Sequence, residues 1–64
     1  MKLSRLLRAA EPFEIVTIVY LCGEKSTILF SGGCHDFRLG RKDYDVVLFQ
    51  KEKDASFTIL VKEE

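Results

Sequence analysis

Three adjacent residues, Cys34, His35 and Asp36, combine a thiol, an imidazole and a carboxylate. A catalytic triad needs these groups to converge, and known triads are assembled from positions far apart in the chain. Successive residues of a strand or turn point apart, so adjacency counts against catalysis. The single histidine and two cysteines also lack the paired spacing of a metal site. We therefore expect no enzyme activity, no metal and no cofactor, and interpret the trio as a turn with a half-buried cysteine and a surface histidine.

A second set of residues has the chemistry to bind an anion. A serine and two glycines precede a predicted helical turn, where free backbone N–H groups could point at a phosphate, and three basic residues follow closely. The P-loop pattern GxxxxGK[ST] is absent, so a plain turn is the leading interpretation, with nucleotide or phosphate binding as the alternative. The candidate partner- or ligand-binding residues are Ser31, Gly32, Gly33, Arg38, Arg41 and Lys42.

The composition narrows the class of protein. With 64 residues, the chain is long enough for one domain near the lower size at which a core folds unaided. The net charge is zero, which disfavours nonspecific nucleic-acid or membrane binding. The longest apolar run is too short to span a bilayer as a helix, and arginines interrupt the first ten residues where a signal peptide needs an unbroken apolar region. These features predict a cytoplasmic protein.

The elements that position these residues follow from apolar periodicity. Residues 3–10 have the apolar spacing of one helical face, with Ser4 as a candidate N-cap and Pro12 as the end of the helix. Runs rich in β-branched and aromatic residues predict strands at residues 13–22, 27–30, 44–50 and 56–62. The predicted fold is α+β, one domain over residues 1–64: a short N-terminal helix packed on a four-stranded antiparallel sheet made of two hairpins. Curling of the sheet toward a small barrel is the alternative.

The two cysteines are predicted to be reduced. If the first two strands form a hairpin that turns at Gly23, Cys22 and Cys34 lie at opposite ends of it, roughly 20 Å apart. A disulfide needs Cα atoms within about 7 Å, so an intrachain bridge is not expected. This agrees with a cytoplasmic location, where thiols are kept reduced.

Both faces of the predicted sheet are apolar, but one short helix covers only one of them. We expect the helix to cover the face that carries Ile15, Val19 and Leu21. An apolar patch of the size left on the other face is unusual on a soluble monomer. We therefore predict a homodimer, with barrel closure or a dedicated partner protein as alternatives. The predicted interface residues are Val16, Ile18, Tyr20, Leu29, Val47, Phe49 and Leu60.

Several features of pattern and size follow one another along the chain: the opening MKLSRLL, a β-branched strand after Pro12, a hairpin into LFSG at residues 29–32, YDVV at 44–47 and a final ILV at 59–61. In these features the chain resembles small uncharacterised proteins encoded by phages and mobile elements of Firmicutes-type bacteria. The resemblance implies an accessory role as a stoichiometric protein-binding module with a host or phage protein as partner. A counter-defence inhibitor of the anti-CRISPR kind is one such role. The resemblance assigns no functional residues.

Overall fold

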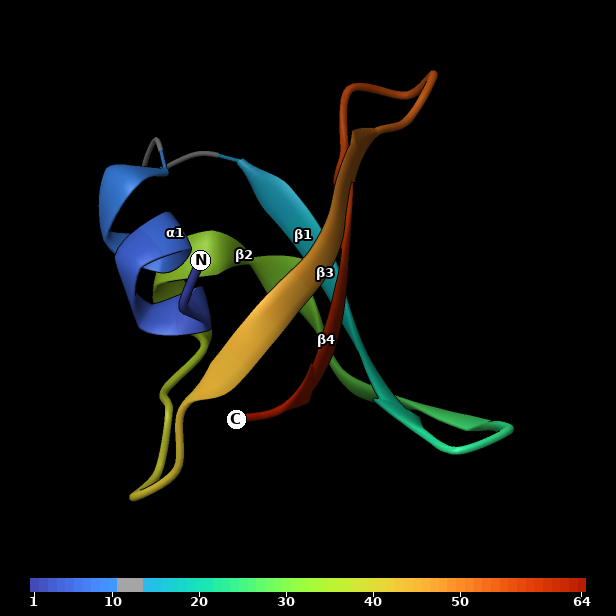
Figure 1. The fold of residues 1–64 in the computed structure, drawn as a ribbon. Coiled ribbons are helices and arrows are strands. Elements are labelled where there is room, and N and C mark those ends of the chain that lie inside the picture. The colour runs from blue at the N-terminus through green and yellow to red at the C-terminus, as the bar shows by residue number, and fades with distance from the viewer. Residues whose placement is uncertain (11–13) are drawn as a thin grey trace.

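A computed structural model of the chain describes residues 1–10 and 14–64 (Figure 1). The structure confirms the α+β class: one short helix lies against a four-stranded sheet. Pro12 and Phe13, the predicted end of the helix and start of the first strand, lie outside the described residues. The elements in chain order are α1 (Leu3–Ala9), β1 (Ile15–Cys22), β2 (Lys25–Gly33), the one-turn 3-10 helix η1 (Cys34–Asp36), β3 (Tyr44–Lys51) and β4 (Phe57–Glu63).

The sheet is mixed, so the prediction of a purely antiparallel sheet is wrong. Its strand order is β2-β1-β4-β3. Both predicted hairpins form, β1 with β2 and β3 with β4. They are joined by a parallel pairing of β1 with β4, because residues 34–43 carry the chain from the β2 edge to the β3 edge and the second hairpin then returns β4 to the centre. No pairing closes β2 onto β3 within the described residues, so the sheet is open rather than a barrel.

The hydrophobic core lies on one face of the sheet, which we call the inner face. Paired residues of neighbouring strands point to the same side, so Ile18 of β1 and Ile59 of β4 share this face. Figure 1 shows α1 and residues 34–43 on this side of the sheet. The residues buried there are Leu3, Val16, Ile18, Cys34, Ile59 and Val61.

The prediction of which face the helix covers is also wrong. Val16 and Ile18, expected on the uncovered face, are 2% and 0% exposed. Ile15, expected beneath the helix, is 49% exposed. The alternation of side chains along a strand assigns each residue to one of two faces. When both faces are apolar, it does not indicate which face is covered. The crossing residues 34–43 and the parallel register with β4 decide that, and neither is local in the sequence.

Helix α1 is anchored to the β3 edge at its N-terminal end. Its N-cap residue is Lys2, without a side-chain cap, so the prediction that Ser4 caps the helix is wrong. The backbone N–H of Val46 donates to the carbonyl oxygen of Met1 at 2.8 Å, and Lys2 bridges to Asp45. The Lys2 ammonium donates to Glu64 at 2.6 Å and to Asp45 at 3.0 Å, which raises the pKa of Lys2 to about 12. The chain start therefore occupies part of the β3 edge.

The turns explain why the two hairpins form locally. Residues 23–24 connect β1 to β2, and Gly23 takes the φ of +62° that this two-residue turn requires. The β3–β4 turn instead places an alanine, Ala55, at φ +71°. A non-glycine residue in this left-handed region carries a steric cost of about 1–2 kcal/mol.

Replacing Ala55 by glycine should therefore raise the free energy of unfolding by about 0.5–1 kcal/mol, because relief of the steric cost exceeds the extra entropy of glycine in the unfolded chain. Urea denaturation followed by circular dichroism measures the change. Gly23→Ala is the matched control: nothing lies within 4 Å of a Cβ placed there, so only its positive φ should matter. That variant should lose stability. A loss of stability in both variants would contradict the role given to Ala55.

Candidate functional site

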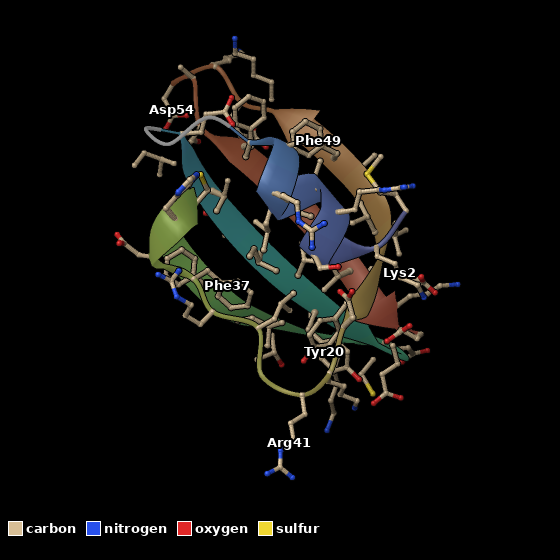
Figure 2. All side chains as sticks on the ribbon, turned by 90° about the vertical axis from the view of Figure 1, so that its left-hand side faces the viewer. Lys2, Tyr20, Phe37, Arg41, Phe49 and Asp54 are labelled. Carbon is tan, nitrogen blue, oxygen red and sulfur yellow. The ribbon has the colours of Figure 1, made fainter. Side chains whose placement is uncertain are left out.

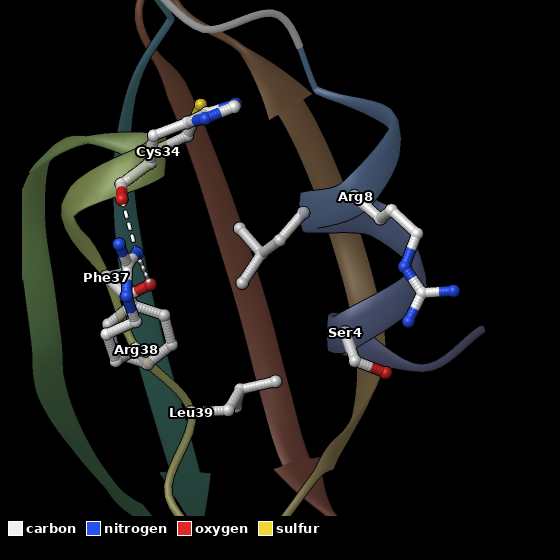
Figure 3. A pocket seen from close by; sticks show the side chains of 8 residues that line it. Ser4, Arg8, Cys34, Phe37, Arg38 and Leu39 are labelled. Carbon is white, nitrogen blue, oxygen red and sulfur yellow. Dashed lines mark hydrogen bonds between the residues drawn. The ribbon is translucent and has the colours of Figure 1, made fainter.

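A pocket opens on the inner side of the molecule, between α1 and the segment that follows β2 (Figure 3). Its volume is about 340 Å³, within the range of small-ligand sites. One wall comes from α1 and the other from η1 and the residues after it. The lining residues are Ser4, Leu7, Arg8, Cys34, His35, Phe37, Arg38 and Leu39.

The lining combines apolar and basic side chains. Leu7, Phe37 and Leu39 supply apolar surface, while Arg8 and Arg38 supply guanidinium groups. Arg38 Nη1 donates to the carbonyl oxygens of His35 at 2.5 Å and Phe37 at 3.2 Å. Within residues 1–10 and 14–64, neither arginine forms an ion pair with a carboxylate. The pocket therefore combines apolar and polar surface, and its two arginines have no carboxylate partner among the described residues.

The side chains of the adjacent trio differ in their exposure to solvent. Cys34 is 3% exposed, whereas His35 and Asp36 are exposed, so the thiol and the carboxylate sit in different environments. The cysteine is thus more deeply buried than the half-buried position predicted. Among the described residues, no group of three or more His, Cys, Asp or Glu side chains is arranged to hold a metal ion.

The predicted phosphate turn is part of a strand. Ser31, Gly32 and Gly33 are the last residues of β2 and pair with β1. The N–H of the next residue, Cys34, donates to the carbonyl oxygen of Glu14 at 2.9 Å. These three residues therefore form a strand end rather than the plain turn that we expected. The alternative, a phosphate cradle of free N–H groups, is not supported either, because the Cys34 N–H is already bonded within the protein.

The three basic residues predicted beside that turn are not brought together. Arg38 lines the pocket, and Arg41 extends from the loop into solvent (Figure 2). The Lys42 ammonium donates to Glu63 Oε1 at 2.6 Å, which raises the pKa of Lys42. The pKa of Glu63 is lowered by that same bond and, to a smaller extent, by a hydrogen bond from Tyr20. Only Arg38 of this set belongs to the pocket.

The opposite side of the sheet, which we call the outer face, carries apolar side chains that neither α1 nor residues 34–43 cover. Register places Val19 of β1 beside Ile28 of β2 and Leu60 of β4. None of the described residues that are buried belongs to this face. In Figure 1 it is the side away from α1. Its apolar members are Ile15, Val19, Leu21, Ile28, Leu48 and Leu60.

The predicted interface residues scatter over both faces. Leu60 lies on the outer face, and Val47 is 51% exposed where the register between β3 and β4 shifts. Phe49 is 46% exposed, but on the inner face, where its ring stacks on Phe57 at 5.0 Å (Figure 2). Leu29 and Tyr20 pack against the core, and the Tyr20 ring meets Tyr44 edge-on at 5.6 Å. Of the predicted interface residues, Leu60 belongs to the apolar outer face, and the other apolar members of that face were not predicted.

Sequence reasoning missed the pocket residues contributed by α1, in particular Leu7 and Arg8. Their partners across the pocket, Phe37 and Arg38, lie about thirty positions further along the chain. An apolar stripe with basic residues on the opposite side is typical of any amphipathic helix and does not indicate a pocket. No signal in the sequence shows that residues 34–39 stop short of the helix and leave a hollow.

No protein-family model, curated protein or solved structure matches the chain significantly. Within the described residues, no helix combines the length and the apolar character that are needed to cross a membrane. Function is therefore inferred from the pocket and the outer face.

Proposed function

We propose that this chain is a non-enzymatic protein-binding module that self-associates through the outer face of its sheet. The observation that carries the proposal is the one-sided cover: α1 and residues 34–43 lie on the inner face, and no described residue of the apolar outer face is buried. Sheets in stable domains bury each apolar face against a second layer. The most exposed apolar side chains of the outer face are Ile28, Ile15 and Leu48, at 65%, 49% and 44%.

A second copy of the chain is the occupant that fits this face best. The formal net charge is zero, so two copies approach without net repulsion. Over β1 and β2, Thr17 and Ser31 are small polar side chains of this face, and their hydroxyl groups hydrogen-bond each other at 3.1 Å. Asp45, Gln50 and Lys62 are the longer polar side chains of this face, on β3 and β4. Two such faces can stack as a β-sandwich, and a symmetric contact uses the same patch on both copies.

The edge of β2 is the surface we propose for the partner protein. β2 is an edge strand, and the other edge, β3, is occupied near its start by Met1 and Lys2. An extended segment of another protein can add to a free edge as a further strand. The resemblance to phage-encoded and mobile-element-encoded proteins supports a host protein as the partner, and the specific form proposed is a stoichiometric counter-defence inhibitor.

Light scattering after size-exclusion chromatography tests self-association. We expect the wild type to have twice the chain mass of 7.4 kDa. Ile28→Lys should weaken the dimer by about 100-fold or more, because an unpaired charge would be buried within the contact. Thr27→Lys is the matched control: Thr27 is also exposed and adjacent in β2, but its pairing with Tyr20 places it on the inner face.

The control should remain dimeric. A wild-type chain that stays monomeric at about 1 mM, or a dimer that tolerates Ile28→Lys, would overturn the proposed use of the outer face. Equal weakening by both variants would also count against it, because it would show a general effect of added charge rather than a contact through one face.

A further inference from the structure

We propose that the pocket between α1 and residues 34–39 binds a small amphipathic anion, a molecule with one negatively charged head and a compact apolar body. The shape supplies the first argument. A cavity of about 340 Å³ with Leu7, Phe37 and Leu39 in its lining offers apolar surface to a molecule of that size. This site is on the inner side of the sheet, so the proposal does not depend on self-association through the outer face.

The charges select the sign of the ligand. Arg8 belongs to one wall and Arg38 to the other, and His35 joins them in the lining, while no carboxylate is among the lining residues. In Figure 3 the Arg8 guanidinium group points away from Arg38, so a ligand that contacts both requires the exposed Arg8 side chain to turn toward the pocket. Bidentate contact with guanidinium groups suits carboxylate and phosphate heads alike. Among the described residues neither guanidinium group has a carboxylate partner, and a neutral ligand would supply none. The shared chemistry is therefore an anionic head attached to an apolar body.

Arg38 is already held in place before any ligand arrives. Its Nη1 atom bonds the carbonyl oxygens of His35 and Phe37, which uses part of a guanidinium group that has five N–H donors. The remaining donors are available to a ligand. A side chain fixed in advance loses less entropy on binding than a mobile one.

Both walls of the pocket are also fixed by contacts outside it. On the α1 side, Ser4 Oγ donates to Asp43 at 2.5 Å. On the other side, the Phe37 ring packs on Phe30 of β2, with ring centroids 5.2 Å apart. The Cys34 N–H is bonded to Glu14 immediately before β1. The hollow is therefore held open by the fold, and a ligand need not separate packed side chains to enter.

Titration with 4-phenylbutyrate, followed by amide chemical shifts and calorimetry, tests the proposal. We expect a dissociation constant of about 1 mM or below, with shifts concentrated at the pocket residues on both walls. The neutral 4-phenylbutanamide should bind at least tenfold more weakly, as should inorganic phosphate, which lacks the apolar body. Phenyl phosphate should bind comparably to the carboxylate if the head alone decides, and a difference between the two assigns the preferred head group.

Arg8→Gln should weaken binding of 4-phenylbutyrate by about tenfold, and the matched control Arg5→Gln should leave it unchanged. Arg5 is exposed on the same helix but does not line the pocket. No shifts at 10 mM probe, equal binding of the amide, or equal weakening by both variants would overturn the proposal. Ile28→Lys, which is expected to break the dimer, should retain ligand binding, so failure of one proposal is distinguishable from failure of the other.

Discussion

Replacing Ile18 by alanine should lower the free energy of unfolding by about 3–4 kcal/mol, the largest loss of any single substitution considered. Ile18 is 0% exposed and lies at the centre of β1, paired with Phe30 on one side and Ile59 on the other. Truncation removes buried methyl groups and leaves a cavity that the paired strands cannot fill. A chain of 64 residues is expected to have a total stability of about 3–10 kcal/mol, so the loss is a third or more of the total.

Ile28→Ala is the matched control, the same change at a residue that is 65% exposed. Measured by urea denaturation at concentrations where light scattering shows a monomer, it should change stability by no more than about 0.5 kcal/mol. The pair of variants separates the two assignments of the sheet faces. A larger loss at Ile28 than at Ile18 would restore the face assignment that the sequence suggested and contradict the arrangement described above.

The elements of this fold are predictable because their signals are local. Gly23 in a two-residue turn sets the first hairpin, and β-branched runs set the strands on both sides of each turn. The mixed sheet is not predictable in that way. Whether β3 or β4 lies beside β1 depends on where residues 34–43 cross, and that path is fixed by Phe37 packing on Phe30 and by Asp43 bonding Ser4.

In the candidate site, too, local features were predictable and long-range contacts were not. The sequence drew attention to Arg38 and to the trio that begins at Cys34, and both segments do line the pocket. It also grouped Arg38 with Arg41 and Lys42, since neighbours in sequence are the only neighbours that a single sequence displays. In the structure, Lys42 forms an ion pair with Glu63, whereas Arg38 lines the same pocket as Arg8 of α1. Long-range contacts decide which basic residues line the same pocket.

One further long-range contact has a large expected effect: the carboxylate of Asp43 acts as the cap that α1 lacks. Its Oδ1 atom accepts the N–H of Ser4 at 3.1 Å and of Tyr44 at 2.8 Å, and its Oδ2 atom accepts the Ser4 hydroxyl. Asp43→Ala should lower the free energy of unfolding by about 2 kcal/mol, because the N–H groups of the helix start and of β3 lose a charged acceptor. Urea denaturation near neutral pH measures this loss.

Acid should reveal the same contact. The hydrogen bond from the Ser4 side chain, followed by those from the Tyr44 and Ser4 backbone, lowers the pKa of Asp43 below its ordinary 3.8, although burial opposes the change. A carboxylate with a lowered pKa in the folded state stabilises the fold above its unfolded pKa, and this contribution disappears as pH falls through the folded value. The stability difference between wild type and Asp43→Asn should therefore be constant from about pH 7 to pH 5 and shrink below pH 4.

Asp45→Asn is the matched control: it removes an exposed partner of Lys2 and should cost less at neutral pH. A difference for Asp43→Asn that stays the same from pH 7 to pH 3 would show that the Asp43 charge does not hold the helix start.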